Sequence, residues 1–109
     1  VDYEEIPPSM AATGTFFALR ASGSSMEPTL RDGDTVIVKQ QPDVDSGNIA
    51  IVLVNGNDAT IKEVQKSREG ITLVGHNVAA YSPHFYSNAE IESLPVRIIG
   101  RVVESRRKF

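Results

Sequence analysis

The chain has 109 residues, of which 40% are hydrophobic and 23% charged, and its formal net charge is −3. This length and composition are typical of one globular domain with a single core, and the negative charge argues against a broad basic surface for nucleic acid. The absence of cysteine excludes disulfides and thiolate metal sites. Because no run approaches the roughly 20 apolar residues of a membrane helix and no signal peptide is recognisable, we expect a cytoplasmic protein without membrane contact.

Short strands and turns follow one another along the chain. Residues 1–15 begin with prolines and acids and are interpreted as the remnant of a linker, whereas residues 16–109 are interpreted as the folded domain. Short runs rich in Val, Ile, Thr and Phe, separated by Gly, Asn, Asp and Pro, predict a compact, mostly β fold with little or no helix. The predicted strands are Phe16–Ala21, Thr35–Lys39, Asn48–Val54, Ala59–Gln65, Ile71–Val74 and Val96–Glu104.

The third of these strands is apolar on both faces, so we expect it to be central and covered on both sides. The turn Asn55-Gly56-Asn57 predicts a tight hairpin that pairs this strand with the next one. Because side chains alternate along a strand, Lys62 would share its face with Thr60 and Val64. Pairing against a buried neighbour would remove much of the water around this lysine.

Ser25 and Lys62 form the pair with the clearest chemical potential. Ser25 lies in a loop rich in glycine and serine that Pro28 stiffens, and Lys62 lies further along in an apolar strand. Serine needs a base to remove its proton, and lysine can act as that base only when it is neutral. A free lysine titrates near ~10.4, and desolvation depresses that value by up to roughly 3–5 units. The pair therefore predicts a Ser-Lys dyad, although each residue alone would suit a connecting loop or an edge strand.

The other polar candidates have plainer interpretations. His76 and His84 both lie in loop-like sequence, and without cysteine or a close carboxylate we expect neither a zinc site nor a cofactor. No Gly-x-Ser-x-Gly elbow supports a Ser-His-Asp triad. Asp32 and Asp34 flank Gly33 and suit a turn better than a general acid/base pair.

Two further groups of side chains call for an interpretation. Tyr81, Phe85 and Tyr86 could form an exposed aromatic surface, but we expect them to pack in the core. The basic run Arg106-Arg107-Lys108 lies at the end of the chain and is expected to be a solvated tail.

Two motifs in sequence order carry a family resemblance. The segment Gly23-Ser24-Ser25-Met26-Glu27-Pro28-Thr29-Leu30-Arg31-Asp32-Gly33-Asp34 resembles the serine motif of the LexA family of Ser-Lys peptidases and phage repressors. The segment Ala59-Thr60-Ile61-Lys62-Glu63-Val64 is similar to that family's lysine strand, and residues 97–103 resemble its last strand. The likeness implies a compact LexA/signal-peptidase-like fold of short antiparallel strands. It also implies Ser25 as nucleophile, Lys62 as general base, and the backbone N–H groups of Ser25 and Met26 as oxyanion donors.

The resemblance further implies the C-terminal self-cleaving and dimerisation domain of a helix-turn-helix transcriptional repressor. Such a domain cuts its own linker peptide, forms a homodimer, and contacts DNA only through an N-terminal domain that this chain does not contain. In repressors that respond to DNA damage, RecA filaments promote the cut.

Two departures from the family pattern keep alternatives open. Position 24 is Ser, where relatives often carry an acid, an amide or methionine, and we expect little effect there. The usual scissile dipeptide, Ala-Gly or Cys-Gly, occurs nowhere in the chain, so either it lies upstream of Val1 or this member does not cleave itself. The alternatives are a catalytically silent dimerisation module, a UmuD-like polymerase accessory, and a signal-peptidase-like protein, although the chain shows no membrane anchor.

Overall fold

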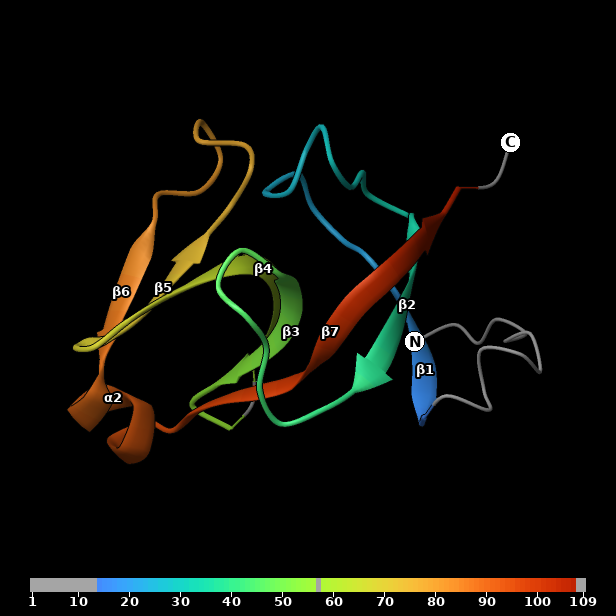
Figure 1. The fold of residues 1–109 in the computed structure, drawn as a ribbon. Coiled ribbons are helices and arrows are strands. Elements are labelled where there is room, and N and C mark those ends of the chain that lie inside the picture. Colours follow the sequence, from blue (N-terminus) through green and yellow to red (C-terminus); the bar gives the residue numbers. More distant parts are fainter. Residues whose placement is uncertain (1–13, 57, 108–109) are drawn as a thin grey trace.

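Figure 1 shows the fold in a computed structural model, which describes residues 14–56 and 58–107. The described residues form strands and one short helix, which confirms the prediction of a mostly β fold with little helix. The elements are β1 (Phe16–Arg20), β2 (Thr35–Gln40), β3 (Ile49–Val54), β4 (Asp58–Ser67), β5 (Gly70–Val74), β6 (His84–Ser87), α2 (Asn88–Ser93) and β7 (Val96–Arg106). Residues 1–13, which include most of the predicted linker, lie outside the described residues.

The strands form one antiparallel sheet in the order β1-β2-β7-β3-β4-β5-β6. The last strand in sequence, β7, therefore lies between β2 and β3, where Figure 1 shows it as a long red arrow. The prediction that Asn48–Val54 contains a central strand is confirmed, because β3 has three strands on either side.

Hydrophobic side chains cover both faces of β3. Ala50 and Val52 belong to one cluster of buried side chains and Ile51 belongs to another, as alternation along a strand requires. The first cluster also contains Val44, Val64, Ile71, Leu73 and Val96, and the second contains Met26, Leu30, Val36 and Val38. The predicted coverage of this strand on both sides is confirmed.

The predicted hairpin joins β3 to β4. Asn55 and Gly56 both have positive φ, 56° and 76°, as the two central residues of a tight hairpin turn require. Asn57 lies outside the described residues. The register places Ala50 opposite Lys62, so the lysine is paired against a completely buried residue. The hairpin thus pairs Lys62 with a buried residue on the neighbouring strand, as the sequence predicted.

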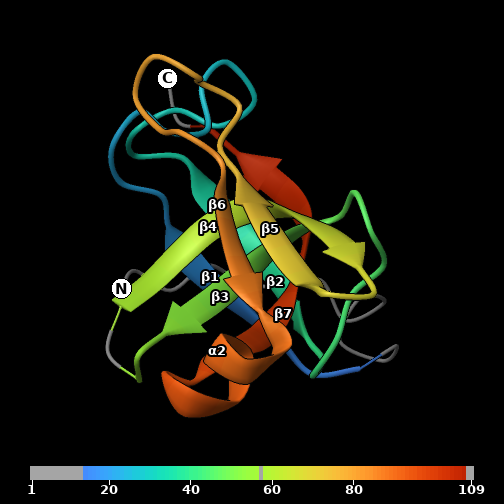
Figure 2. The same cartoon turned by 90° about the vertical axis from the view of Figure 1, so that its left-hand side faces the viewer.

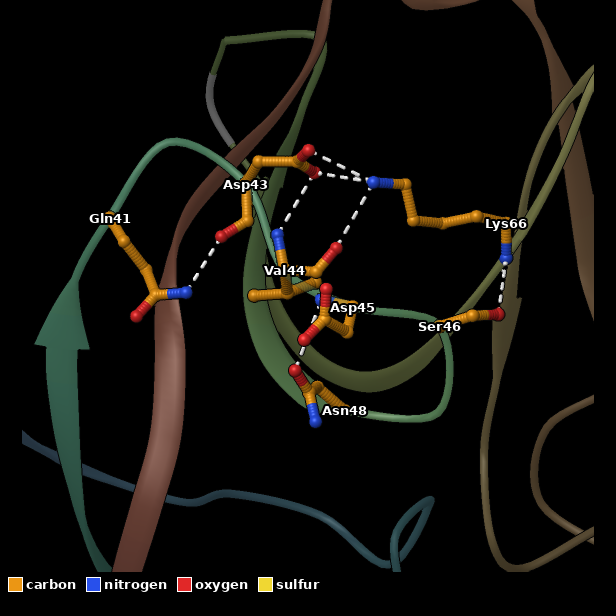
Figure 3. Close-up of polar contacts among 7 residues, drawn as sticks. All are labelled: Gln41, Asp43, Val44, Asp45, Ser46, Asn48 and Lys66. Carbon is orange, nitrogen blue, oxygen red and sulfur yellow. Dashed lines mark hydrogen bonds and ion pairs between the residues drawn. The ribbon is translucent and has the colours of Figure 1, made fainter.

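A second loop is fastened to the far end of β4, as Figure 3 shows. The Lys66 ammonium lies 3.0 and 2.9 Å from the two carboxylate oxygens of Asp43 and donates to the Val44 carbonyl at 3.1 Å. The Lys66 backbone N–H donates to the Ser46 hydroxyl at 2.9 Å. This ion pair and these two further hydrogen bonds hold the β2–β3 connection against β4.

Two elements were not predicted from the sequence. His84, expected in a loop, lies in the short strand β6, and the helix α2 follows it directly. Ser87 caps this helix: its hydroxyl accepts from the Glu90 N–H, while the Glu90 carboxylate accepts from the Ser87 N–H. This reciprocal arrangement is a capping box, and its Ser-x-x-Glu pattern was present in the sequence.

The expectation that all three aromatic residues pack in the core is wrong for Phe85, whose side chain is 46% exposed. Tyr86 does pack against the first cluster of buried side chains. Phe85 and Tyr86 are neighbours on β6, so their side chains point to opposite faces of the sheet. Because β6 is an edge strand, the described residues cover the Phe85 side chain only in part.

Candidate active site

Ser25 lies in the serine loop, the connection from residue 21 to residue 34 that joins β1 to β2. Two hydrogen bonds close tight turns around it: the Glu27 N–H donates to the Ser24 carbonyl at 3.1 Å, and the Leu30 N–H donates to the Met26 carbonyl at 3.0 Å. Met26 and Leu30 are each only 4% exposed and pack into the second cluster of buried side chains. The loop is thus helix-free, as expected, but two apolar side chains anchor it in the core.

Lys62 comes from β4, and its side chain meets the serine loop. Its Nζ lies 3.0 Å from Ser25 Oγ and 2.6 Å from Thr60 Oγ1. The contact with Thr60 agrees with the predicted common face on the strand. Lys62 is only 5% exposed, and burial lowers the pKa of its ammonium group. The structure therefore brings the two predicted residues within hydrogen-bond distance and places the lysine where burial disfavours its charged form.

The loop between β5 and β6 covers the other side of Lys62. The Lys62 ammonium lies 4.6 Å from the centroid of the Tyr81 ring, and burial, with a smaller contribution from Tyr86, raises the pKa of the Tyr81 hydroxyl. Among the residues that the structure describes, no carboxylate forms an ion pair with Lys62. An aromatic ring and two hydroxyls surround the lysine in place of a counter-charge.

Three consecutive residues at the end of β5, Gly75–Asn77, form a clamp on the serine loop. The Asn77 backbone N–H donates to the Ser25 carbonyl at 2.9 Å, and its side-chain amide donates to the Ser24 carbonyl at 3.1 Å. A Cβ at Gly75 would lie 2.8 Å from the Ser25 carbonyl oxygen, so only glycine permits this approach. Figures 1 and 2 both show the β5–β6 loop beside the β1–β2 loop at one end of the molecule.

His76, the middle residue of the clamp, connects the serine loop to β4. Its Nδ1 lies 2.5 Å from Thr29 Oγ1, and its Nε2 lies 2.9 Å from the Glu63 carboxylate. The prediction that His76 lies in a loop is confirmed, but these contacts were not predicted. They join residues far apart in sequence, and no local pattern marks them.

The dyad lines a cavity of about 230 Å³. Its other walls are largely apolar or small, and they include Leu19, Ala21, Gly23, Met26, Leu30, Ile51, Ala59 and Ile61. Among the described residues, one side of β4 carries no strand pairing here, because β5 pairs only with the half of β4 that runs from Glu63 to Ser67. The stretch from Asp58 to Lys62 thus presents backbone hydrogen-bonding groups beside the cavity, as a partner peptide in extended form would need.

Comparison with known proteins identifies the family. The Peptidase S24-like family model matches residues 1–103. The chain belongs to this family. The LexA repressor of Thermobifida fusca is 36% identical over 98% of this chain and 39% of that protein, and the LexA repressor of Corynebacterium efficiens is 33% identical over 99% and 43%. The resemblance that the sequence motifs predicted is confirmed: this is a LexA-like domain of the Peptidase S24-like family, and it spans about two fifths of the length of these relatives.

Asp32 and Asp34 shape the turn of this S24-like domain, as predicted. Asp32 accepts from the Gly23 N–H at 2.8 Å, and the buried Asp34 accepts from the Arg31 N–H at 2.9 Å. The Arg107 guanidinium donates to both Asp34 oxygens, at 2.8 and 2.9 Å, and together with the Arg31 N–H it lowers the pKa of Asp34 to about 2 against the cost of burial. The expectation of a solvated tail is therefore wrong for Arg107, which pins the chain end to the base of the serine loop.

Residues 14–56 and 58–107 contain no group of three or more His, Cys, Asp or Glu side chains that could hold a metal ion. Within the same ranges no helix has the length and apolar character needed to cross a bilayer.

Proposed function

We propose that this chain is the C-terminal self-cleaving and dimerisation domain of a LexA-like transcriptional repressor, with Ser25 as nucleophile and Lys62 as general base. The observation that carries the proposal is the 3.0 Å separation of Ser25 Oγ and Lys62 Nζ at a cavity, with the lysine buried and its pKa lowered. Membership of a peptidase family and the similarity to LexA repressors support it.

The chemistry follows from the protonation state of Lys62. In its neutral form the amine can donate to Thr60 while its lone pair accepts the Ser25 proton, as the serine oxygen attacks a peptide carbonyl carbon. Lys62 then returns the proton to the leaving amine, and water hydrolyses the acyl-enzyme with the same base.

The backbone N–H groups of Ser25 and Met26 are the proposed oxyanion donors. Among the hydrogen bonds between described residues, neither group donates to another protein atom, so both are available to a developing oxyanion. A donor of this kind is worth roughly 2.7–4 kcal/mol of transition-state stabilisation.

The proposed substrate is the linker peptide of the same polypeptide, between this domain and an N-terminal helix-turn-helix domain that would contact DNA. The open side of β4 beside the cavity supports an extended peptide as substrate. We further propose a homodimer in the cytoplasm, with RecA filaments as the partner that promotes cleavage if the parent responds to DNA damage.

The test uses the intact parent protein, incubated between pH 7 and pH 10, with any cut mapped by mass spectrometry. Lys62→Ala should abolish a linker cut while circular dichroism shows an unchanged fold, because no other base within hydrogen-bond distance of Ser25 remains in the described residues. Lys66→Ala, on the same strand, is the matched control and should cut at the wild-type rate. Unchanged cleavage in Lys62→Ala would remove the assignment.

A silent dimerisation module is the second candidate, and the absence of Ala-Gly and Cys-Gly from this chain favours it. It predicts a parent protein that stays intact at pH 10 yet sediments as a dimer. A UmuD-like accessory is separated from a repressor by the residues that precede Val1 in the parent, and a signal-peptidase-like protein by its failure to cut its own chain.

A further inference from the structure

His76 bridges the two elements that carry the dyad. Glu63, which holds its Nε2, directly follows Lys62 on β4, and Thr29, which holds its Nδ1, lies four residues after Ser25 on the serine loop. The side chains of His76 and Glu63 are each 24% exposed, so the bridge is shielded from most of the solvent.

Hydrogen-bond chemistry fixes the direction of the contact with Glu63 and allows either direction for the contact with Thr29. The Glu63 carboxylate is ionised and can only accept, because hydrogen bonds from Gln65 and His76 lower its pKa; therefore Nε2 carries the proton and donates. In neutral His76 the remaining nitrogen, Nδ1, accepts from the Thr29 hydroxyl. In protonated His76 the same nitrogen donates to the Thr29 oxygen. Both contacts are possible for the neutral and for the protonated imidazole, so the bridge does not depend on the charge of His76.

The geometry points to His76 as a positioning residue that keeps the Ser25 loop seated on Lys62. This inference rests on the proposed Ser-Lys chemistry. Ser25 and Lys62 sit on separate elements, and small displacements of reacting groups cost rate steeply: a shift of about 1 Å can cost on the order of 10²-fold. The same seating keeps water away from the Lys62 amine. Losing the bridge therefore changes both the rate and the pH at which the dyad becomes active.

Two conservative variants each retain half of the bridge. Asparagine places its polar group where Nδ1 lies, so His76→Asn retains the contact with Thr29; glutamine reaches the position of Nε2, so His76→Gln retains the contact with Glu63. Asn77 still holds the Ser24 and Ser25 carbonyls in both variants, which should therefore remain folded. His84→Gln is the matched control, because that histidine stacks on Tyr86 and takes no part in the bridge.

The readout is the rate at which a fluorophosphonate labels Ser25, measured from pH 6 to pH 11. In this reaction the serine oxygen bonds to phosphorus, fluoride leaves, and Lys62 takes the proton. We expect both His76 variants to label about 10-fold more slowly or worse, with the midpoint of the pH profile moved upward because Lys62 regains water. Two other titratable groups lie near the site and could affect the pH profile: Tyr81 over Lys62 and Glu63 beside His76. Neither residue is substituted in these variants.

A second substitution shows whether the two contacts act as one bridge. Thr29→Val should add nothing in the His76→Gln background, where its partner is already gone, and little in the His76→Asn background, where the link to Glu63 is already broken. Non-additivity of this kind is the signature of groups that act together. Full additivity in both backgrounds would overturn the bridge.

The remaining outcomes are also decisive. Wild-type rate and midpoint in both His76 variants would overturn the proposal, as would a slower rate with an unchanged midpoint, which a purely structural role predicts. If the wild-type chain itself is not labelled at Ser25, the proposed function fails instead. The bridge is then judged by nuclear magnetic resonance: the pKa of the Lys62 amine must rise in His76→Asn, and an unchanged value would overturn it.

Discussion

Lys62 and Lys66 are the same residue type on the same strand, four positions apart, and they hold two different loops. Lys66 is 37% exposed and pairs with both oxygens of the Asp43 carboxylate, so charge fastens the β2–β3 loop to β4. Lys62 is buried, lacks a carboxylate partner among the described residues, and faces Ser25, Thr60 and Tyr81. The serine loop is fastened by packing and by the clamp at Gly75–Asn77.

The contrast teaches what turns a structural lysine into a candidate base. An ion pair stabilises the ammonium form and suits a lysine that only holds a loop, whereas burial without a counter-charge favours the neutral amine. Lys62 could not both hold its loop through an ion pair and act as a base. In this fold, other residues hold the serine loop in place. Four changes test this division, from the largest expected effect to the smallest.

Thr60→Asp would give Lys62 the counter-charge that Lys66 already has. An adjacent carboxylate shifts a pKa by roughly 1–3 units towards the charged form, so the rate of Ser25 labelling at pH 8 should fall by about 10- to 1,000-fold. The profile should recover at higher pH. Thr60→Val, which removes the hydroxyl without adding charge, is the control and should leave the midpoint close to that of the wild type.

Gly75→Ala would push the serine loop away from Lys62. Its Cβ would lie 2.8 Å from the Ser25 carbonyl oxygen and 2.9 Å from Tyr81, so the loop must move. We expect labelling to slow by about 10-fold or more and stability to fall by about 1–3 kcal/mol. Gly100→Ala crowds the Lys39 carbonyl at 2.5 Å, away from the site. It should lose stability, in urea unfolding, without a comparable loss of labelling in the folded fraction.

Lys62→Met should make the protein more stable at neutral pH. Because the pKa of Lys62 is lowered on folding, the unfolded chain binds more protons between the folded value and about 10.4. Wild-type stability therefore rises with pH through that window, and each pKa unit is worth about 1.4 kcal/mol. Urea unfolding at pH 7 and pH 10 should show this rise in the wild type and its absence in Lys62→Met. The same pH dependence of stability in the two proteins would contradict a lowered pKa of the buried Lys62 amine.

Lys66→Met should have the smallest effect, about 0–1 kcal/mol, because the pair that it breaks is exposed to solvent. The Lys66 hydrogen bond is the main reason that the pKa of Asp43 is lowered, so the contribution of the pair is present above about 3.8 and is lost as the pH falls through the lowered value. The difference from wild type should thus shrink in acid, and Ser25 labelling should not change. A loss of labelling in this variant would mean that the two lysines are not functionally separate.

Local pattern was enough to predict every strand of the described residues except β6, and to predict that Ser25 and Lys62 lie close together. The tight turn at Asn55-Gly56 and the apolar run of β3 fixed the hairpin, and the hairpin fixed the environment of Lys62. The Ser25 motif then supplied its partner. Each of these signals lies within a few residues of the feature that it predicts.

The clamp could not be predicted in this way. Its contacts join Asn77 to Ser24 and His76 to Thr29, across 53 and 47 residues, and a loop asparagine or histidine looks the same whether or not it meets a partner. The bond from Arg107 to Asp34 spans 73 residues and has the same character. The helix α2 is different, because its capping box was readable in the sequence and was missed.

The position of β7 decides when strand pairing can connect the two elements that carry Ser25 and Lys62. Of the strands in the described residues, β7 is synthesised last, yet it separates β2 from β3 in the sheet. Ser25 precedes β2 and Lys62 follows β3, so no strand pairing joins the two sides until β7 inserts between them. Ribosomes deliver the N-terminal part first, at about 5–20 residues per second. On the proposed function, a nascent repressor therefore carries its serine and its lysine for some seconds before the completed sheet connects them, and we expect self-cleavage only after Val96–Arg106 has been translated.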